Sequence, residues 1–135
     1  MVKRIEQVGA VNVAVVGLGW WGCHIIERFS NRTGSPLRIQ LAVEQAPDKA
    51  LDFVRRHELE LIDDYQLALD RSDIEAVILT TPHAQHEEQV IQAATAGKHV
   101  FCEKPLALSQ ESAQRMVTCC SGAEVVLGIG HERRF

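Results

Sequence analysis

A glycine-rich turn between a strand-like run and a helix-like stretch constrains this chain most. The β-rich run Val11–Val16 leads directly into Gly17, Gly19 and Gly22, and a helical pattern follows at once. In this order the first glycine permits a tight turn, the second lets the backbone approach a pyrophosphate, and the third allows close helix–strand packing. The helix N-terminus then favours an anion. A GxGxxG string alone is weak evidence, because loops collect glycine, but its position here predicts a dinucleotide site.

Length and charge limit the classes of protein to consider. The chain has 135 residues, 46% of them hydrophobic, which suits one globular domain with a single core. The formal charge of -4 and scattered Lys and Arg residues argue against nucleic acid or an anionic membrane as a partner. No apolar run reaches the length of about 20 residues that a membrane helix needs, and the N-terminus lacks a secretion signal. We therefore expect a cytoplasmic protein.

The cysteines predict neither disulfides nor a metal site. Cys23, Cys102, Cys119 and Cys120 show no CxxC spacing, and adjacent cysteines rarely bridge. A structural zinc site needs better-grouped ligands. We expect four reduced thiols, mostly buried, and no metal.

Short β-rich runs alternate with longer helical stretches along the whole chain, a pattern typical of a parallel sheet covered on both faces. Strands are predicted at 11–16, 38–43, 60–62, 74–79, 98–102 and 125–129. Helices are predicted at 21–32, 46–57, 65–69, 83–96 and 110–121, with Asp63 or Asp64 and Ser109 as N-caps. The prediction is one dinucleotide-binding domain over residues 1–135, a doubly wound, mainly parallel six-stranded α/β sheet of the Rossmann type.

An acidic residue follows the second predicted strand. Glu44 lies 22 residues after Gly22, where a carboxylate accepts hydrogen bonds from the adenosine ribose hydroxyls of a dinucleotide and repels a 2′-phosphate. This position favours NAD over NADP. The alternatives are that Glu44 is a solvated strand-end residue, or that Arg55 or Arg56 approaches the ribose and softens the preference.

Two further clusters follow predicted strands at the same sheet edge. After residues 74–79 comes a TTPHAQH segment at 80–86, whose His86 either contacts a ligand or is an inert surface histidine. After residues 98–102 come Glu103, Lys104 and Pro105. Lys104 is placed to hold a substrate oxygen, with Glu103 orienting it or bonding a ribose. The alternative for this pair is a surface ion pair of little energetic value.

Three segments together resemble the N-terminal half of the Gfo/Idh/MocA oxidoreductases, the group of glucose-fructose oxidoreductases and inositol dehydrogenases. They are GLGWWG at 17–22, TPHAQH at 81–86 and AGKHVFCEKP at 96–105. The last is the most specific, and the resemblance covers essentially the whole chain.

The resemblance implies a role for each matching residue. Gly17, Gly19 and Gly22 fall on the phosphate-binding glycines, and Glu44 on the ribose-selecting position. Thr81, Pro82 and His86 match the segment beside the nicotinamide, Lys104 matches a lysine that touches substrate, and Pro105 is expected to be cis. Residues 133–135 resemble the entry to a second domain. The candidate sites are therefore catalytic Lys104 and Glu103, and cofactor-binding Gly17, Gly19, Trp20, Trp21, Gly22, Glu44, Thr80, Thr81, Pro82, His86, Glu103 and Lys104.

The implied activity is hydride transfer between a nicotinamide cofactor and a sugar, cyclitol or related polyol, with Lys104 holding the substrate oxygen. Family members continue for about another domain's length, which supplies a catalytic histidine and most of a dimer interface. We expect residues 1–135 alone to bind NAD weakly, to catalyse little and to self-associate. The alternatives are a non-catalytic dinucleotide sensor or scaffold module, and, less favoured because of residues 103–105, another nucleotide such as adenosylmethionine.

Overall fold

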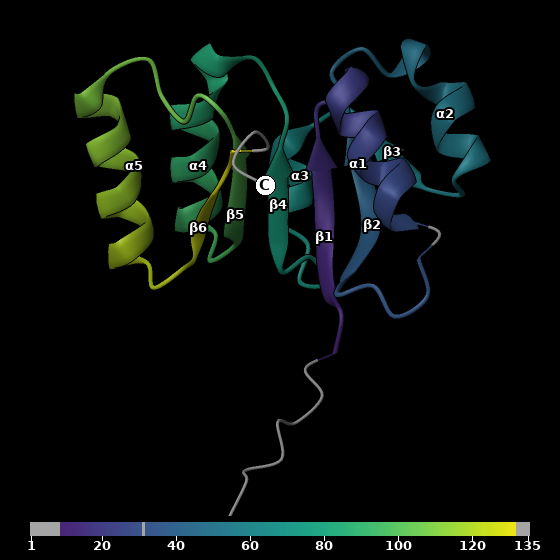
Figure 1. Ribbon diagram of the computed structural model, residues 1–135, viewed down its shortest axis with the longest axis horizontal. Coiled ribbons are helices and arrows are strands. Elements are labelled where there is room, and N and C mark those ends of the chain that lie inside the picture. The colour runs from purple at the N-terminus through teal and green to yellow at the C-terminus, as the bar shows by residue number, and fades with distance from the viewer. Residues whose placement is uncertain (1–8, 31, 132–135) are drawn as a thin grey trace, which may run out of the picture.

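The computed structural model describes residues 9–30 and 32–131, which form one six-stranded sheet flanked by helices (Figure 1). The strand order is β3-β2-β1-β4-β5-β6, and every neighbouring pair is parallel. The predicted doubly wound α/β class is confirmed, with a sheet that is wholly rather than mainly parallel.

The elements follow one another as strand and helix along the chain. The strands are β1 (Val11–Val16), β2 (Leu37–Val43), β3 (Glu60–Ile62), β4 (Ala76–Leu79), β5 (His99–Glu103) and β6 (Leu127–Gly130). The α-helices are α1 (Trp20–Ser30), α2 (Leu51–Arg56), α3 (Tyr65–Leu69), α4 (His86–Thr95) and α5 (Gln110–Gly122), and two 3-10 turns are η1 (Pro47–Lys49) and η2 (His83–Gln85).

The predicted boundaries are wrong by one to two residues at most ends, and two predicted helices are divided. The segment at 46–57 is a 3-10 turn followed by α2, because Ala50 N–H donates to the carbonyl of Pro47 three residues back, at 2.9 Å. Likewise 83–96 begins as η2 before α4. The N-caps Asp64 and Ser109 are confirmed, since their side chains accept from Gln66 N–H and Ser112 N–H.

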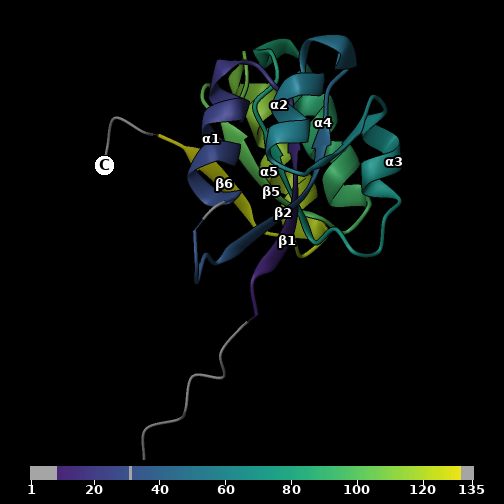
Figure 2. The same cartoon turned by 90° about the vertical axis from the view of Figure 1, so that its right-hand side faces the viewer.

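The sheet separates two layers of core. Val13 and Val15 of β1 pack with α1 and α2, whereas Ala14 and Val16 pack with the layer that contains residues of α3, α4 and α5. Figure 2 shows α1 and the pair α3 and α4 on opposite sides of the strands. Right-handed crossovers explain this division, because β1 to β3 progress in one direction across the sheet and β4 to β6 in the other.

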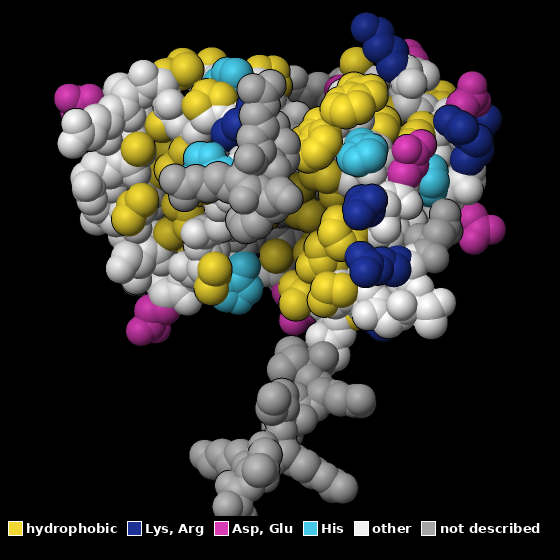
Figure 3. All heavy atoms as spheres, viewed as in Figure 1, with side chains coloured by type: hydrophobic (Ala, Val, Ile, Leu, Met, Phe, Trp, Pro, Cys, Tyr) yellow, Lys and Arg dark blue, Asp and Glu magenta, His cyan; other side chains and the backbone are white. Residues whose placement is uncertain are grey.

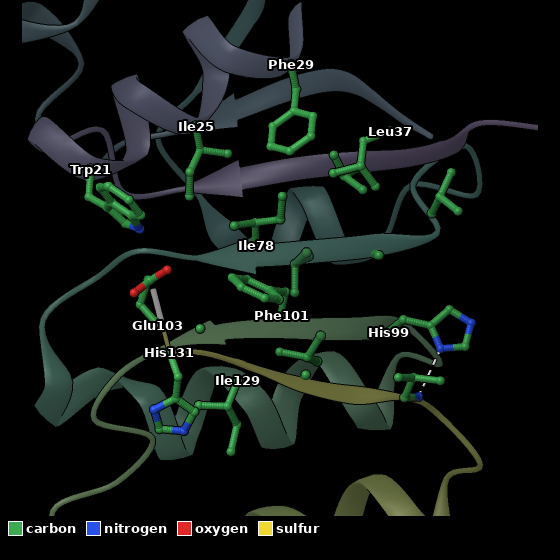
Figure 4. Close-up of a pocket in the computed structure, with 18 residues that line it drawn as sticks. Trp21, Ile25, Phe29, Leu37, Ile78, His99, Phe101, Glu103, Ile129 and His131 are labelled. Atoms are coloured by element: carbon green, nitrogen blue, oxygen red, sulfur yellow. Dashed lines mark hydrogen bonds between the residues drawn. The ribbon is translucent and has the colours of Figure 1, made fainter. Parts of the chain in front are cut away.

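The same topology leaves part of one sheet face open. In Figure 1, α1 lies in front of β1 and β2, but no helix of the described residues lies in front of β5 and β6. Along β5, His99 and Phe101 are exposed while Val100 and Cys102 are buried. Hydrophobic side chains gather over this hollow in Figure 3. Its lining includes the side chains of Ile25, Phe29, Ile78, Phe101 and Ile129 (Figure 4), and we call this 450 Å³ cavity the apolar groove.

Within the described residues, no helix combines the length and apolar character that crossing a membrane requires.

Candidate functional site

A cleft opens at the carboxyl edge of the sheet beside β1 and β4, where the strand order changes direction. Open α/β sheets bind ligands at this point. The cleft measures about 490 Å³. Six residues singled out from the sequence line it together: Gly17, Gly19, Glu44, Thr80, Thr81 and Pro82. We call it the dinucleotide cleft.

The three glycines of the turn meet different surroundings. Gly17 has φ +91°, and a Cβ there would lie 2.9 Å from the carbonyl oxygen of Thr80. A Cβ on Gly22 would collide with the carbonyl of Gly17, so this glycine allows α1 to pack against the turn. A Cβ on Gly19 would meet no protein atom within 4 Å and would extend into open space. Gly17 and Gly22 are therefore required by the fold, whereas Gly19 leaves room for a ligand.

Thr80 holds the glycine turn against β4. Its hydroxyl donates to the carbonyl of Gly17 at 2.6 Å, and its backbone N–H donates to Val16 at 2.9 Å. The Gly17 N–H in turn donates to the carbonyl of Val43 at 2.8 Å. The turn is thus fixed to both neighbouring strands before any ligand binds.

Glu44 reaches the turn from the end of β2. One carboxylate oxygen accepts from the Leu18 N–H at 2.7 Å and the other accepts from the Ala46 N–H at 3.2 Å. A carboxylate has about four lone-pair directions, so acceptor capacity remains on the cleft side. Glu44 is therefore a part of the turn and not only a solvated strand-end residue.

His86 lies beneath the site. Its side chain is fully buried, which excludes the alternative of a surface histidine. Its Nδ1 lies 2.9 Å from the carbonyl oxygen of Pro105 and its Nε2 lies 3.0 Å from that of Thr81. The ring therefore joins the loop after β4 to the loop after β5. The Lys104–Pro105 peptide bond in that second loop is cis, as the resemblance implies.

The remaining predicted residues do not line the dinucleotide cleft. Trp20 is 78% exposed and stacks on Trp21, which packs against the core layer of α1. Trp21 and Glu103 both line one end of the apolar groove, where Figure 4 shows them pointing toward one another from α1 and β5. The indole N–H of Trp21 is buried and has no hydrogen-bond partner among the described residues. Lys104 is exposed in the loop that follows β5.

Several residues of the cleft were missed from the sequence: Gln45, Asp63, Tyr65, Gln85 and Gln89. The signal that was available is spacing. Gln85 and Gln89 are four residues apart in a helical segment directly after Thr81, so they share one helix face. That face looks into the cleft.

Lys98 belongs to the segment at 96–105 that resembles the family most specifically, and its role is to support the fold. It is buried, and its Nζ donates to the carbonyls of Arg71 and Ile74, each at 2.7 Å. The lysine therefore closes the turn that precedes β4 rather than contacting a ligand.

Burial disfavours the thiolate form of three of the four cysteines. Burial raises the pKa of Cys102 to about 12, and burial also raises the pKa values of Cys23 and Cys120. All four cysteines are free, two of them buried and two half-buried. Among the described residues, no three His, Cys, Asp or Glu side chains are grouped to hold a metal ion.

Comparison with known proteins agrees with this geometry. The sequence profile of an oxidoreductase family with an NAD-binding Rossmann fold, GFO_IDH_MocA, matches residues 11–131. A 2,7-anhydro-N-acetylneuraminate hydratase of Mediterraneibacter gnavus is 34% identical over 93% of this chain and 32% of its own length. An inositol 2-dehydrogenase of Rhodococcus erythropolis is 31% identical over 93% of this chain and 36% of its own length.

A solved structure shows the same fold with a cofactor. The crystal structure of scyllo-inositol dehydrogenase from Lactobacillus casei, with bound NAD(H) and scyllo-inositol, superposes with a TM-score of 0.85 at 26% identity. The superposition covers 93% of this chain and 37% of that one. The chain thus spans about a third of the length of the relatives it matches. With its glycine turn, its cleft and this profile match over residues 11–131, the chain belongs to the Gfo/Idh/MocA oxidoreductase family with an NAD-binding Rossmann fold.

Proposed function

We propose that this chain is the dinucleotide-binding domain of an oxidoreductase that transfers a hydride between NAD and a sugar, cyclitol or related polyol. The observation that carries the proposal is the convergence of Gly17, Gly19, Glu44 and Thr80–Pro82 on one cleft at the carboxyl edge of the sheet. The family, and relatives named as inositol dehydrogenases, support the substrate class.

The cleft fits a dinucleotide on the evidence of Gly19. A Cβ built on Gly19 would meet no surrounding protein atom within 4 Å, and Gly19 directly precedes the 11-residue helix α1. A pyrophosphate in this space accepts from backbone N–H groups and benefits from the helix dipole. Glu44 beside it supplies the acceptor for ribose hydroxyls and repels a 2′-phosphate, so NAD is favoured over NADP.

The chemical step involves the loop after β5. NAD, when bound, supplies the carbon that gives or takes the hydride. Lys104 lies exposed at the same edge of the sheet, and we assign it the role of holding the substrate oxygen. His86 positions this loop through Pro105, and Glu103 ends β5 directly before the lysine. We also propose that Trp20 and Trp21, which directly follow Gly19, contact the bound cofactor at the open side of the glycine turn.

We also propose a cytoplasmic location and self-association. The four free thiols support the first. Two features support self-association of two copies. The apolar groove leaves hydrophobic side chains such as Phe101 open on the face of the sheet, and such apolar surface favours burial against a second copy. Separately, β6 has a strand neighbour on one side only among the described residues, so its free edge can pair with a strand of that copy.

Isothermal titration of the polypeptide with NADH and NADPH tests cofactor binding, and Glu111→Ala, at an exposed residue of α5 outside the cleft, is the control. We expect NADH to bind more tightly than NADPH, and Glu111→Ala to bind NADH as the unaltered chain does. If neither NADH nor NADPH binds, the proposal is contradicted. Strong polyol-dependent NADH formation by residues 1–135 alone would contradict the assignment of these residues as one domain of a larger enzyme.

A further inference from the structure

A chain of three polar side chains runs along the wall of the dinucleotide cleft. The Thr81 hydroxyl lies 2.5 Å from Oε1 of Gln89, and Nε2 of Gln89 donates to Oε1 of Gln85 at 3.3 Å. Thr81 follows β4, Gln85 lies in η2 and Gln89 lies in the first turns of α4. All three line the cleft, and Gln89 is only 9% exposed.

The first bond of this chain has a defined direction. The Thr81 hydroxyl donates to Oε1 of Gln89, because an amide oxygen only accepts hydrogen bonds. With Oε1 of Gln89 facing Thr81, its Nε2 faces Gln85, so the second bond runs in the same direction.

The backbone of Gln89 makes a separate hydrogen bond to α3. Its backbone carbonyl accepts from the Tyr65 hydroxyl at 2.8 Å, which joins α4 to α3. Burial raises the pKa of Tyr65 well above its ordinary value, so the tyrosine keeps the proton that it donates. The amide of Gln89 thus projects from a backbone that the Tyr65 hydroxyl joins to α3.

We propose that Gln89 is a positioning residue that sets the hydrogen-bond polarity of the dinucleotide cleft. Because the Thr81 hydroxyl donates its hydrogen bond to Gln89, Thr81 presents lone pairs to the cleft and accepts from a ribose hydroxyl or a carboxamide N–H of the dinucleotide. Gln85, whose carbonyl is occupied by Gln89, presents its N–H groups as donors. Phosphate oxygens only accept hydrogen bonds, so we expect them to bind at the backbone N–H groups of the glycine turn and not at Thr81. This inference rests on the proposed binding of NAD.

A double-mutant cycle tests whether Gln89 acts through Thr81. We expect Gln89→Leu to weaken NAD binding about fivefold in isothermal titration, the loss of a net neutral hydrogen bond. Thr81→Val should weaken binding by at least as much. The double variant should bind like Thr81→Val alone, and in a Thr81→Ser background, which keeps the hydroxyl, the effect of Gln89→Leu should return.

Controls separate positioning from stability. Gln92→Leu makes the same change one turn further along α4, at a residue outside the dinucleotide cleft, and should leave NAD affinity unchanged. Urea unfolding of every variant shows which are folded, and Gln89→Met replaces Gln89→Leu in the cycle if the leucine variant does not fold.

The outcomes distinguish this inference from the proposed function. If the unaltered chain does not bind NAD, the proposed function fails. If the unaltered chain binds NAD but Gln89→Leu binds equally well, or if the effects of Gln89→Leu and Thr81→Val multiply independently, the positioning role is overturned and the proposed function stands.

Discussion

The Glu44 carboxylate accepts a hydrogen bond from the backbone N–H of Leu18 at 2.7 Å. This bond joins the end of β2 to the middle of the glycine turn. The residue expected to select the ribose is therefore built into the structure that is expected to hold the phosphates. A change at Glu44 alters both the charge at the ribose position and the support of the turn.

We expect Glu44→Ala to reduce the preference for NAD over NADP about tenfold, as the charge-assisted bonds to the ribose are lost. Competition titrations with both cofactors measure the ratio. Glu44→Gln keeps an acceptor for the Leu18 N–H without the charge, so it separates support of the turn from repulsion of the 2′-phosphate. Glu111→Ala, at an exposed residue of α5, is the control. An unchanged ratio in Glu44→Ala would reject the selective role.

Two alanine substitutions in the glycine turn should have opposite effects. Gly19→Ala should leave the urea midpoint nearly unchanged, because its Cβ meets no protein atom, while NAD affinity falls at least about tenfold as the methyl group occupies the pyrophosphate space. Gly22→Ala should lower the free energy of unfolding by about 1–3 kcal/mol, because its Cβ collides with Gly17. Equal NAD affinity in Gly19→Ala would show that the pyrophosphate lies elsewhere.

Lys98→Met should destabilise the fold without touching the cleft. The substitution leaves the carbonyls of Arg71 and Ile74 without the donor that now serves both, at an expected cost of about 1–3 kcal/mol. Urea unfolding measures it. Lys49→Met, at an exposed lysine of η1, should change stability by less than about 0.5 kcal/mol. Similar midpoints for the two variants would mean that the buried ammonium contributes nothing.

Acid should weaken the contact between α4 and α5. Hydrogen bonds from Arg115, and secondly from Ser112, lower the pKa of Glu87 in the folded protein. A lowered folded-state pKa gives a contribution that is complete above the ordinary value of 4.5 and is lost as pH falls below it. Urea midpoints measured from pH 7 to pH 3 should therefore fall less steeply for Glu87→Gln. The control is Glu88→Gln on the next residue, and a slope unchanged by Glu87→Gln would contradict the assignment.

Self-association through the apolar groove should depend on Phe101. This side chain is 39% exposed on β5, and Phe101→Ser removes apolar surface from the proposed contact. Light scattering at increasing concentration should show dimers or larger species for the unaltered chain and a shift toward monomer for the variant. Leu67→Ser, which removes a 52% exposed leucine on α3, is the matched control. A monomer at all concentrations would exclude self-association.

The fold class and much of the site followed from local pattern. Alternating apolar runs identified every strand and helix, because their periods reflect burial on both faces of a parallel sheet. The glycine spacing and the strand-end positions placed Gly17, Glu44 and Thr80 at one edge. Exact boundaries were less predictable, since the division of 46–57 depends on whether Ala50 bonds three or four residues back.

The tertiary structure decided what the local pattern leaves open. Gln89 and Tyr65 meet at the cleft because the Tyr65 hydroxyl of α3 donates to the backbone carbonyl of Gln89 in α4, 24 residues away in the chain. His86 is buried because the loop after β5 closes over it. The apolar groove exists because the crossovers of β4 to β6 place their helices on one face only. The sequence by itself determined which elements form and at which sheet edge the glycine turn, Glu44 and Thr80 meet, through periodicity and turn chemistry. Only the packing of distant elements determined which side chains line that edge, because hydrogen bonds and burial between them depend on positions in space and not on separation along the chain.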